Sequence, residues 1–186
     1  MENKRRNIEE VKKRVIWIYG APFCGKTTFA NGFPDPLMIN TDGNIRYVDA
    51  PYIRIKDDVK VEGRMTKRTL AWENFKDTVT ELEKKDNDFR TIVVDLLEDL
   101  YEHCRCWCLD NNTDTDTDLE YISSLKRIVN LDYENIILIS NEGTIKPDIS
   151  DMISAMVNEV LSIEFDGEKV FAYPLYATTK CGIIRV

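Results

Sequence analysis

The chain has 186 residues, 43% hydrophobic and 31% charged, a composition typical of a globular protein long enough to bury a core within one domain. Its formal net charge of −8 argues against a large sequence-independent nucleic-acid surface, because such surfaces need a basic face. No apolar run approaches the roughly 20 residues that cross a bilayer, and the basic residues 1–14 lack the apolar segment of a secretory signal. Five cysteines fit reduced cytoplasmic thiols better than a disulfide framework.

The strongest motif lies in residues 15–30, VIWIYGAPFCGKTTFA. An apolar run predicts a buried strand, and G-x-x-x-x-G-K-[ST] follows it directly and leads into a helical pattern. Its two glycines let successive N–H groups converge into an anion-binding nest, at which the N-terminal end of the helix also points. Lys26 would contact the β- and γ-phosphates, and the Thr27 hydroxyl would ligate Mg²⁺. The alternative, a chance match on an ordinary strand–helix turn, is disfavoured by the flanking pattern.

This motif predicts a nucleoside triphosphate site. The residues predicted to bind the nucleotide are Gly20, Ala21, Pro22, Phe23, Cys24, Gly25, Lys26, Thr27 and Thr28.

A breaker-rich connection over residues 31–36 is followed by a short apolar strand at 37–39 and by the polar residues 40–43. Ligands bind at the carboxyl ends of strands in open α/β sheets, so Thr41-Asp42-Gly43 is either part of a site or a plain turn. Further on, residues 52–55 predict a strand, 56–68 a mobile charged loop and 70–85 a helix.

Basic residues gather in two places. One cluster lies within residues 4–14, and the other comprises Lys56, Lys60, Arg64, Lys67 and Arg68. Charge alone does not identify a partner for either cluster.

The second strong pattern is Thr91-Ile92-Val93-Val94-Asp95, four residues that favour β-structure and end in a carboxylate. Alone this pattern is common by chance. At this distance after a P-loop it predicts a Walker B strand, whose Asp95 would hold Mg²⁺ through its water shell.

A helix predicted over residues 96–109 carries the run His103-Cys104-Arg105-Cys106-Trp107-Cys108. Zinc sites favour paired ligands with further ligands a dozen or more residues away, so packed small side chains are favoured over a metal site. The acidic residues 111–118 lack the Gly and Glu of an EF-hand and predict a solvated loop, with Asp118 as N-cap of the next helix.

That next helix is expected over residues 119–130, and a buried strand over 135–143 ends in polar residues. Parallel strands present their carboxyl ends to one crevice, so Ser140, Asn141 and Glu142 are candidate sensors of the γ-phosphate, unless they form an ordinary strand-end turn.

The remaining chain predicts a helix over 148–160 and strands over 161–165, 170–176 and 183–186, with a hairpin turn at Asp166-Gly167 and a polar loop over 178–182. Little room is left for a second domain. We therefore expect a single domain over residues 1–186, with 1–14 as a flexible basic lead-in.

Taken together, residues 14–186 resemble the compact RecA-like, AAA-type ATPases of bacteriophages, a family of nucleotide-binding or single-strand annealing proteins. The resemblance rests on IYGAPFCGKTTFA, LMINTDG, TIVVDLLEDLYE, NIILISNEG and KPDISDMISAMVNEV. It implies an α/β fold, RecA-like and of the P-loop NTPase class, with a mostly parallel central sheet flanked by helices and with C-terminal β-strands.

The resemblance also implies roles for individual residues. The carboxylate that assists hydrolysis falls on Asp42, where such proteins usually carry Glu, and the shorter side chain is a departure that bears on water activation. The polar residue after the fourth core strand falls on Asn141. A cation from a neighbouring subunit often completes such sites, and Lys180 is the matching position. The catalytic set so implied is Lys26, Asp42, Asp95, Asn141 and Lys180, with Thr27 and Asp95 as metal ligands.

The function implied by the resemblance is Mg²⁺-dependent ATP hydrolysis in phage DNA recombination or replication. Single-stranded DNA, a single-strand-binding protein and further copies of the chain would be partners, and the host bacterial cytoplasm the location. Two alternatives remain: a nucleotide-switched binding module with weak or no hydrolysis that partners a single-strand-binding protein, and a small-molecule kinase. A kinase usually needs an Arg-rich lid, and no such cluster lies near the later strands.

Overall fold

The computed structural model describes residues 13–111, 116–179 and 182–185. It contains an eight-stranded sheet in the order β10-β9-β8-β1-β7-β6-β2-β3 and a separate two-stranded hairpin, β4–β5. The strands are β1 (Arg14–Gly20), β2 (Pro36–Asn40), β3 (Tyr52–Arg54), β4 (Asp58–Glu62), β5 (Met65–Thr69), β6 (Thr91–Asp95), β7 (Asn135–Asn141), β8 (Glu159–Phe165), β9 (Val170–Thr179) and β10 (Gly182–Arg185). The helices are α1 (Lys26–Asn31), α2 (Ala71–Glu83), α3 (Leu97–Asp110), α4 (Thr117–Val129) and α5 (Pro147–Met156).

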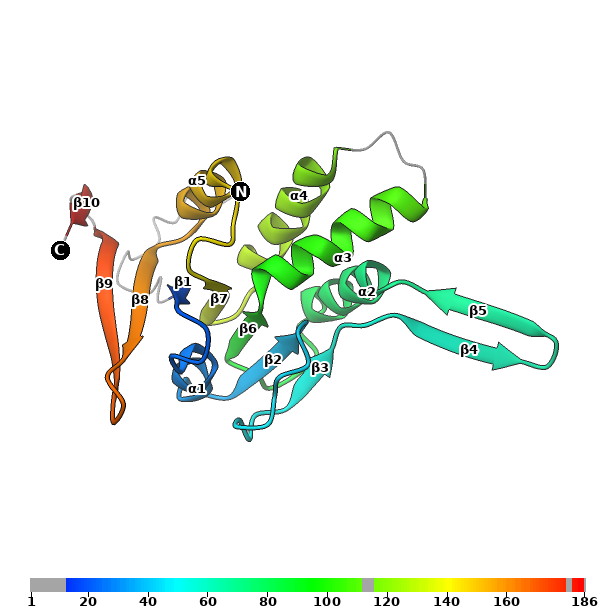
Figure 1. The fold of residues 1–186 in the computed structure, drawn as a ribbon, viewed down its shortest axis with the longest axis horizontal. Helices are drawn as coiled ribbons and strands as arrows, with labels where there is room; N and C mark the ends of the chain where they lie inside the picture. Colours follow the sequence, from blue (N-terminus) through cyan, green and yellow to red (C-terminus); the bar gives the residue numbers. More distant parts are fainter. Residues whose placement is uncertain (1–12, 112–115, 180–181, 186) are drawn as a thin grey trace, which may run out of the picture.

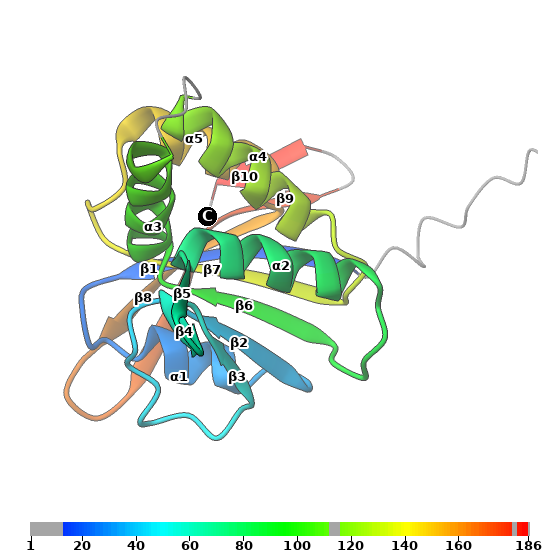
Figure 2. The same ribbon diagram turned by 90° about the vertical axis from the view of Figure 1, so that its right-hand side faces the viewer.

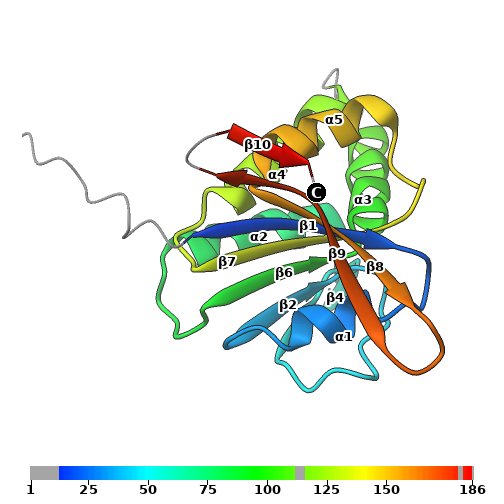
Figure 3. The same cartoon turned by 90° about the vertical axis from the view of Figure 1, so that its left-hand side faces the viewer.

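The sheet is parallel from β3 to β8 and antiparallel at β8–β9 and β9–β10. Helices α2 to α5 cover one face and α1 lies on the other (Figures 1 and 3). This arrangement confirms the predicted α/β class with its mostly parallel sheet and C-terminal strands.

The central strands are buried on both faces, as expected for parallel strands that have helices on either side. In β1, Val15 and Trp17 pack beneath α2–α5, whereas Ile16 and Ile18 pack toward α1. Every residue of β6 is buried, including the terminal Asp95. The Asp95 carboxylate is therefore held in a fixed position by the buried central sheet.

Strand β7 lies between β1 and β6, so the P-loop strand and the Walker B strand are not neighbours. The register aligns Gly20 with Asn141, and Asp95 with Ile139. The ends of β1, β6 and β7 consequently reach the same edge of the sheet, where the site is built.

Residues 56–68, predicted to form a mobile loop, instead contain the β4–β5 hairpin, which projects from the body of the molecule (Figures 1 and 2). Strand β4 (DVKVE) alternates polar and apolar residues, whereas β5 (MTKRT) has Met65 as its one apolar residue. The two-residue turn places Gly63 with a φ of 63° at its first position, as type II′ turns do. The prediction was wrong because the segment is densely charged and only β4 shows the alternation typical of a strand.

Three smaller differences also appear. Helix α5 ends at Met156 rather than near residue 160, because Val157 is extended and β8 already pairs with β1 from Glu159 onward. Asp116, not Asp118, caps α4 by accepting a hydrogen bond from the Asp118 amide. Strand β9 extends to Thr179 into the predicted polar loop.

The cysteines of α3 divide between core and surface. Cys104 and Cys108 are buried, as expected for packed small side chains, whereas Cys106 is exposed and its thiol lies 3.6 Å from Glu102 Oε1. None of the helices in the described ranges is long and apolar enough to cross a membrane.

Candidate functional site

The loop between β1 and α1 has the backbone that its glycines permit. Gly25 has a φ of 92°, in the left-handed region, and a Cβ there would meet Val170 Cγ2 at 2.8 Å. At Gly20 a Cβ would collide with the carbonyl oxygen of Ile163 on β8. Both positions therefore require glycine because a Cβ would not fit, and Gly25 requires it also because of its left-handed backbone conformation.

Lys26, the first residue of α1, is only 5% exposed. Its Nζ donates to Gly20 O at 3.0 Å, to Ala21 O at 2.7 Å and to Asn141 Oδ1 at 3.0 Å. An ammonium has three N–H donors, so these oxygens use all of them. A phosphate oxygen that binds Lys26 must replace one of the three, and Asn141 is the one side chain among them.

Thr27 and Asp95 form the second half of the site. The Thr27 hydroxyl donates to Asp95 Oδ2 at 2.7 Å, and Asp95 is 1% exposed. Burial raises the pKa of Asp95 to about 6, opposed by the Thr27 hydrogen bond and reinforced by the nearby Asp42 carboxylate.

Asp95 Oδ1 is buried and has no hydrogen-bond partner among the described residues. A carboxylate oxygen left without a donor, beside a threonine hydroxyl, has the ligand chemistry that Mg²⁺ prefers. The residues present therefore fit the implied cation, with Thr27 and Asp95 as the groups that would hold it.

Thr41 fixes the end of the Walker B strand. Its amide donates to Asp95 O at 2.7 Å, and its hydroxyl bonds both the amide and the carbonyl of Leu96, at 2.7 and 2.8 Å. The polar residues after β2 therefore form a turn and also hold the end of β6 in position through hydrogen bonds.

Asp42 follows directly and is exposed. Its Oδ1 accepts hydrogen bonds from Asn40 Nδ2 and from the Asn44 amide, both at 2.8 Å. The other amide atom of Asn40, Oδ1, accepts from the Gly43 amide and, at 2.5 Å, from Arg54. A buried asparagine therefore fixes the turn that carries Asp42.

Of the three candidate sensors, the structure brings one to the site. Asn141 contacts Lys26, whereas Ser140 accepts a hydrogen bond from Trp17 Nε1 at 2.9 Å on the α5 side of the sheet, and the Glu142 amide donates to Gly20 O. Glu98 of α3 accepts from the Asn141 amide at 2.9 Å, and its partial burial raises its pKa. Sequence reasoning missed Glu98, because its contact is with a residue 43 positions further along the chain.

These side chains surround one cavity of about 490 Å³. Its lining comprises Pro22, Phe23, Gly25, Lys26, Thr27, Thr28, Asp42, Asn44, Tyr47, Val48, Asp95, Leu96 and Asn141. Of the predicted loop residues, Gly20 and Ala21 face Lys26 through their carbonyls, and Cys24 is buried behind the loop. Asn44, Tyr47, Val48 and Leu96 were not predicted, and Lys180 lies outside the described residues.

A P-loop and a Walker B carboxylate, brought together at the carboxyl edge of a mostly parallel sheet, define the P-loop NTPase class of fold. The family model described as an AAA domain matches residues 12–168, and the chain belongs to this family. Among solved structures, the chain is similar to the flagellar accessory protein FlaH from Methanocaldococcus jannaschii, with 14% identity, a TM-score of 0.48, and coverage of 93% of this chain and 89% of FlaH. Comparison with curated proteins finds no match.

Proposed function

We propose that this chain is a Mg²⁺-dependent ATP hydrolase. The observation that carries the proposal is the convergence of Lys26, the Thr27–Asp95 pair, Asp42 and Asn141 on one cavity. Lys26 is a cation that can bind phosphate, the Thr27–Asp95 pair supplies oxygens for Mg²⁺, and the exposed Asp42 carboxylate can accept a proton from water. Among the described lining residues Lys26 is the only cation, which disfavours the kinase alternative.

In the proposed reaction a water oxygen attacks the γ-phosphorus, the bond from that phosphorus to the β–γ bridging oxygen breaks, and ADP leaves. Asp42 accepts the proton of the attacking water, while Lys26 and Asn141 orient the γ-phosphate. Mg²⁺ held at Thr27 and Asp95 would neutralise charge on the β- and γ-oxygens.

Asp42→Asn is expected to lower ATP turnover roughly 100-fold, because a positioned general base contributes about 10²–10⁴ in rate. Nucleotide affinity should change little, since asparagine can still accept the hydrogen bonds of Asn40 and Asn44. Steady-state kinetics and nucleotide titration measure the two effects. Asp86→Asn, an exposed acid outside the cavity, is the matched control, and unaltered turnover in Asp42→Asn would place the base elsewhere.

We also propose a side chain that binds the nucleotide base. Tyr47 lines the cavity and is 85% exposed, so its ring is available for stacking. Base–aromatic stacking is worth about 1–3 kcal/mol, so Tyr47→Ala should raise the KM for ATP about tenfold with little change in kcat. Tyr47→Phe should behave as wild type, and Tyr52→Ala, on β3 outside the cavity, is the control. Equal KM values for Tyr47→Ala and wild type would show that Tyr47 does not bind the nucleotide base.

We further propose that the chain acts on single-stranded DNA in phage recombination or replication. It would do so in the cytoplasm of an infected bacterium and as an assembly of several copies. Its support is the resemblance of the motif set to RecA-like phage ATPases. It is tested by ATP hydrolysis with and without single-stranded DNA at low salt, where phosphate contacts are strongest. Several-fold stimulation supports the proposal, and an identical rate with and without DNA contradicts its DNA-directed part.

A nucleotide-switched module that partners a single-strand-binding protein is the second candidate. The Lys26–Asn141 hydrogen bond favours it, because phosphate binding must compete with a contact that ties the P-loop to β7. Tight ATP binding with negligible turnover, together with nucleotide-dependent affinity for a single-strand-binding protein, would select this function over hydrolysis.

A further inference from the structure

Arg54 is the last residue of β3 and lies beside the turn that carries Asp42. In the parallel pairing of β2 with β3, it is directly opposite Asn40. Side chains alternate between the two faces of a strand, and Met38, two residues before Asn40, packs toward α1. Asn40 and Arg54 therefore share the face of the sheet on which the P-loop helix lies.

The Arg54 guanidinium packs against this turn and bonds to it. Its Nη1 donates to Asn40 Oδ1 at 2.5 Å, and the same oxygen accepts a hydrogen bond from the Gly43 amide at 3.0 Å. A Cβ on Gly43 would lie 2.7 Å from Arg54 Nη2 and 2.8 Å from Cζ and Nη1. The guanidinium thus fills the space that a side chain at Gly43 would need.

The two donors on Oδ1 fix the orientation of the Asn40 carboxamide. Asn40 is fully buried, and its Nδ2 donates to Asp42 Oδ1 at 2.8 Å. In the reversed orientation the NH₂ group would face the Gly43 amide and the Arg54 guanidinium, and Asp42 would lose its donor. Buried donors without acceptors are costly, so the observed orientation is strongly preferred.

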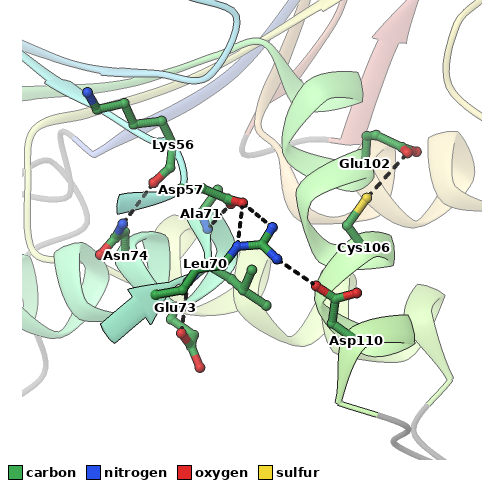
Figure 4. Close-up of polar contacts among 10 residues, drawn as sticks. Lys56, Asp57, Leu70, Ala71, Glu73, Asn74, Glu102, Cys106 and Asp110 are labelled. Atoms are coloured by element: carbon green, nitrogen blue, oxygen red, sulfur yellow. Dashed lines mark hydrogen bonds and ion pairs between the residues drawn. The ribbon is translucent and has the colours of Figure 1, made fainter. Parts of the chain in front are cut away.

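The backbone that carries Arg54 is fixed by the residues that follow it, which Figure 4 shows. Lys56 O accepts a hydrogen bond from Asn74 Nδ2 of α2 at 2.8 Å. The Asp57 carboxylate accepts one from the Ala71 amide, at the start of α2, at 2.9 Å. The guanidinium therefore extends from a strand end that is attached to a helix.

Asp42 needs such support, because it is exposed and an exposed side chain can adopt several rotamers. Its Oδ1 is held by Asn40 and by the Asn44 amide. Its Oδ2 accepts no hydrogen bond from the residues that the structure describes, and this oxygen remains for a water molecule. The orientation of Oδ2 consequently depends on how firmly Oδ1 is held.

We propose that Arg54 is a positioning residue for ATP hydrolysis, which acts through Asn40 to hold the Asp42 carboxylate toward the attacking water. The inference rests on the proposed function, in which Asp42 is the base. The described lining of the nucleotide cavity does not include Arg54, so the residue acts without contacting ATP. Its effect should therefore appear in kcat and not in KM.

Steady-state ATP hydrolysis by the full chain tests this role. Arg54→Ala should lower kcat about tenfold with little change in KM, because an oriented base matters only in the transition state. Arg54→Met, which keeps an aliphatic stem beside Gly43 but has no donor, should show the same loss. Arg54→Lys, which retains charge and N–H donors, should recover most of the rate. Arg90→Ala, which removes an arginine bonded to Glu134 at the start of β6, is the control and should match wild type.

A double-mutant cycle separates positioning of Asp42 from a general effect on the fold. If Arg54 acts through Asp42, Arg54→Ala should cause no further loss of kcat in a chain that already carries Asp42→Asn. Equal fold losses in the two backgrounds would show that Arg54 acts independently of Asp42 and would overturn the proposal. Thermal unfolding checks that every variant folds.

The remaining outcomes distinguish this inference from the proposed function. Wild-type kcat in folded Arg54→Ala and Arg54→Met chains, together with slow turnover in Asp42→Asn, would overturn the role of Arg54 alone. Unaltered turnover in Asp42→Asn would overturn the role of Asp42 as the base, and that of Arg54 with it. A wild-type chain that does not hydrolyse ATP would contradict the proposed function itself.

Discussion

Lys26→Ala is expected to reduce ATP affinity about 100-fold or more. The ammonium would make two charge-assisted contacts with the β- and γ-phosphates, each worth roughly 1.5–3 kcal/mol, and alanine makes neither. The substitution also removes the donor shared by Gly20 O, Ala21 O and Asn141 Oδ1. Calorimetric or fluorescent-nucleotide titration of the purified chain measures the loss.

The loss of three internal hydrogen bonds makes a second measurement necessary, since a misfolded variant also fails to bind. Thermal unfolding should show that Lys26→Ala still melts cooperatively. Lys84→Ala, which removes an exposed lysine on the far side of the sheet, should bind ATP like wild type. Unchanged ATP affinity in a folded Lys26→Ala would contradict the assignment of this cavity to a triphosphate.

Asp95→Asn should abolish Mg²⁺-dependent turnover and yet stabilise the fold at neutral pH. The pKa of Asp95 is about 6 in the folded chain, against an ordinary value near 4 when unfolded. Between those values the folded state retains a proton that the unfolded state has lost, so wild-type stability falls as pH rises from about 4 to about 6. The carboxylate therefore costs about 2–3 kcal/mol at pH 7, which asparagine removes while still accepting the Thr27 hydrogen bond.

Urea unfolding without Mg²⁺, at pH 4.5 and at pH 7, measures this effect. Asp95→Asn should exceed wild type in stability at pH 7, with a smaller difference at pH 4.5. Added Mg²⁺ should stabilise wild type and not the variant, because a ligand stabilises only the state that binds it. Turnover should fall at least about 100-fold, since the metal supplies several kcal/mol of charge stabilisation. Equal stability of both chains at pH 7 would contradict the raised pKa, and retained turnover would contradict the metal role.

The sequence was informative wherever short-range pattern and burial agree. The apolar runs that became β1, β2, β6 and β7 could be predicted because strands buried on both faces need uninterrupted hydrophobic residues. The end of α5 could not be predicted, since residues 157–160 fit a helix locally, whereas Val157 is extended and Glu159 begins β8 through pairing with β1. The β4–β5 hairpin was missed for a related reason, because only β4 alternates polar and apolar residues and the segment is richly charged.

Within the site, the residues of the two sequence motifs were predictable because the motif itself fixes their spacing. Asn141 was predicted from the position of its strand end to be a γ-phosphate sensor, and in the structure its side chain accepts a hydrogen bond from Lys26. Tyr47 lies in an irregular connection whose path follows from tertiary packing, and Glu98 accepts a hydrogen bond from the Asn141 amide, which lies 43 residues away in the sequence. The catalytic and metal-binding roles of these residues remain predictions.

The central place of β7 has a consequence for how the chain is made. Strands β1 and β6 cannot join until residues 135–141 have been synthesised and inserted between them. Most contacts of the sheet are therefore distant in sequence, which predicts slow folding and leaves apolar strand edges exposed on the nascent chain. The cavity forms only when β7 is in place. ATP present during synthesis would therefore bind and stabilise only those molecules in which β7 has been inserted.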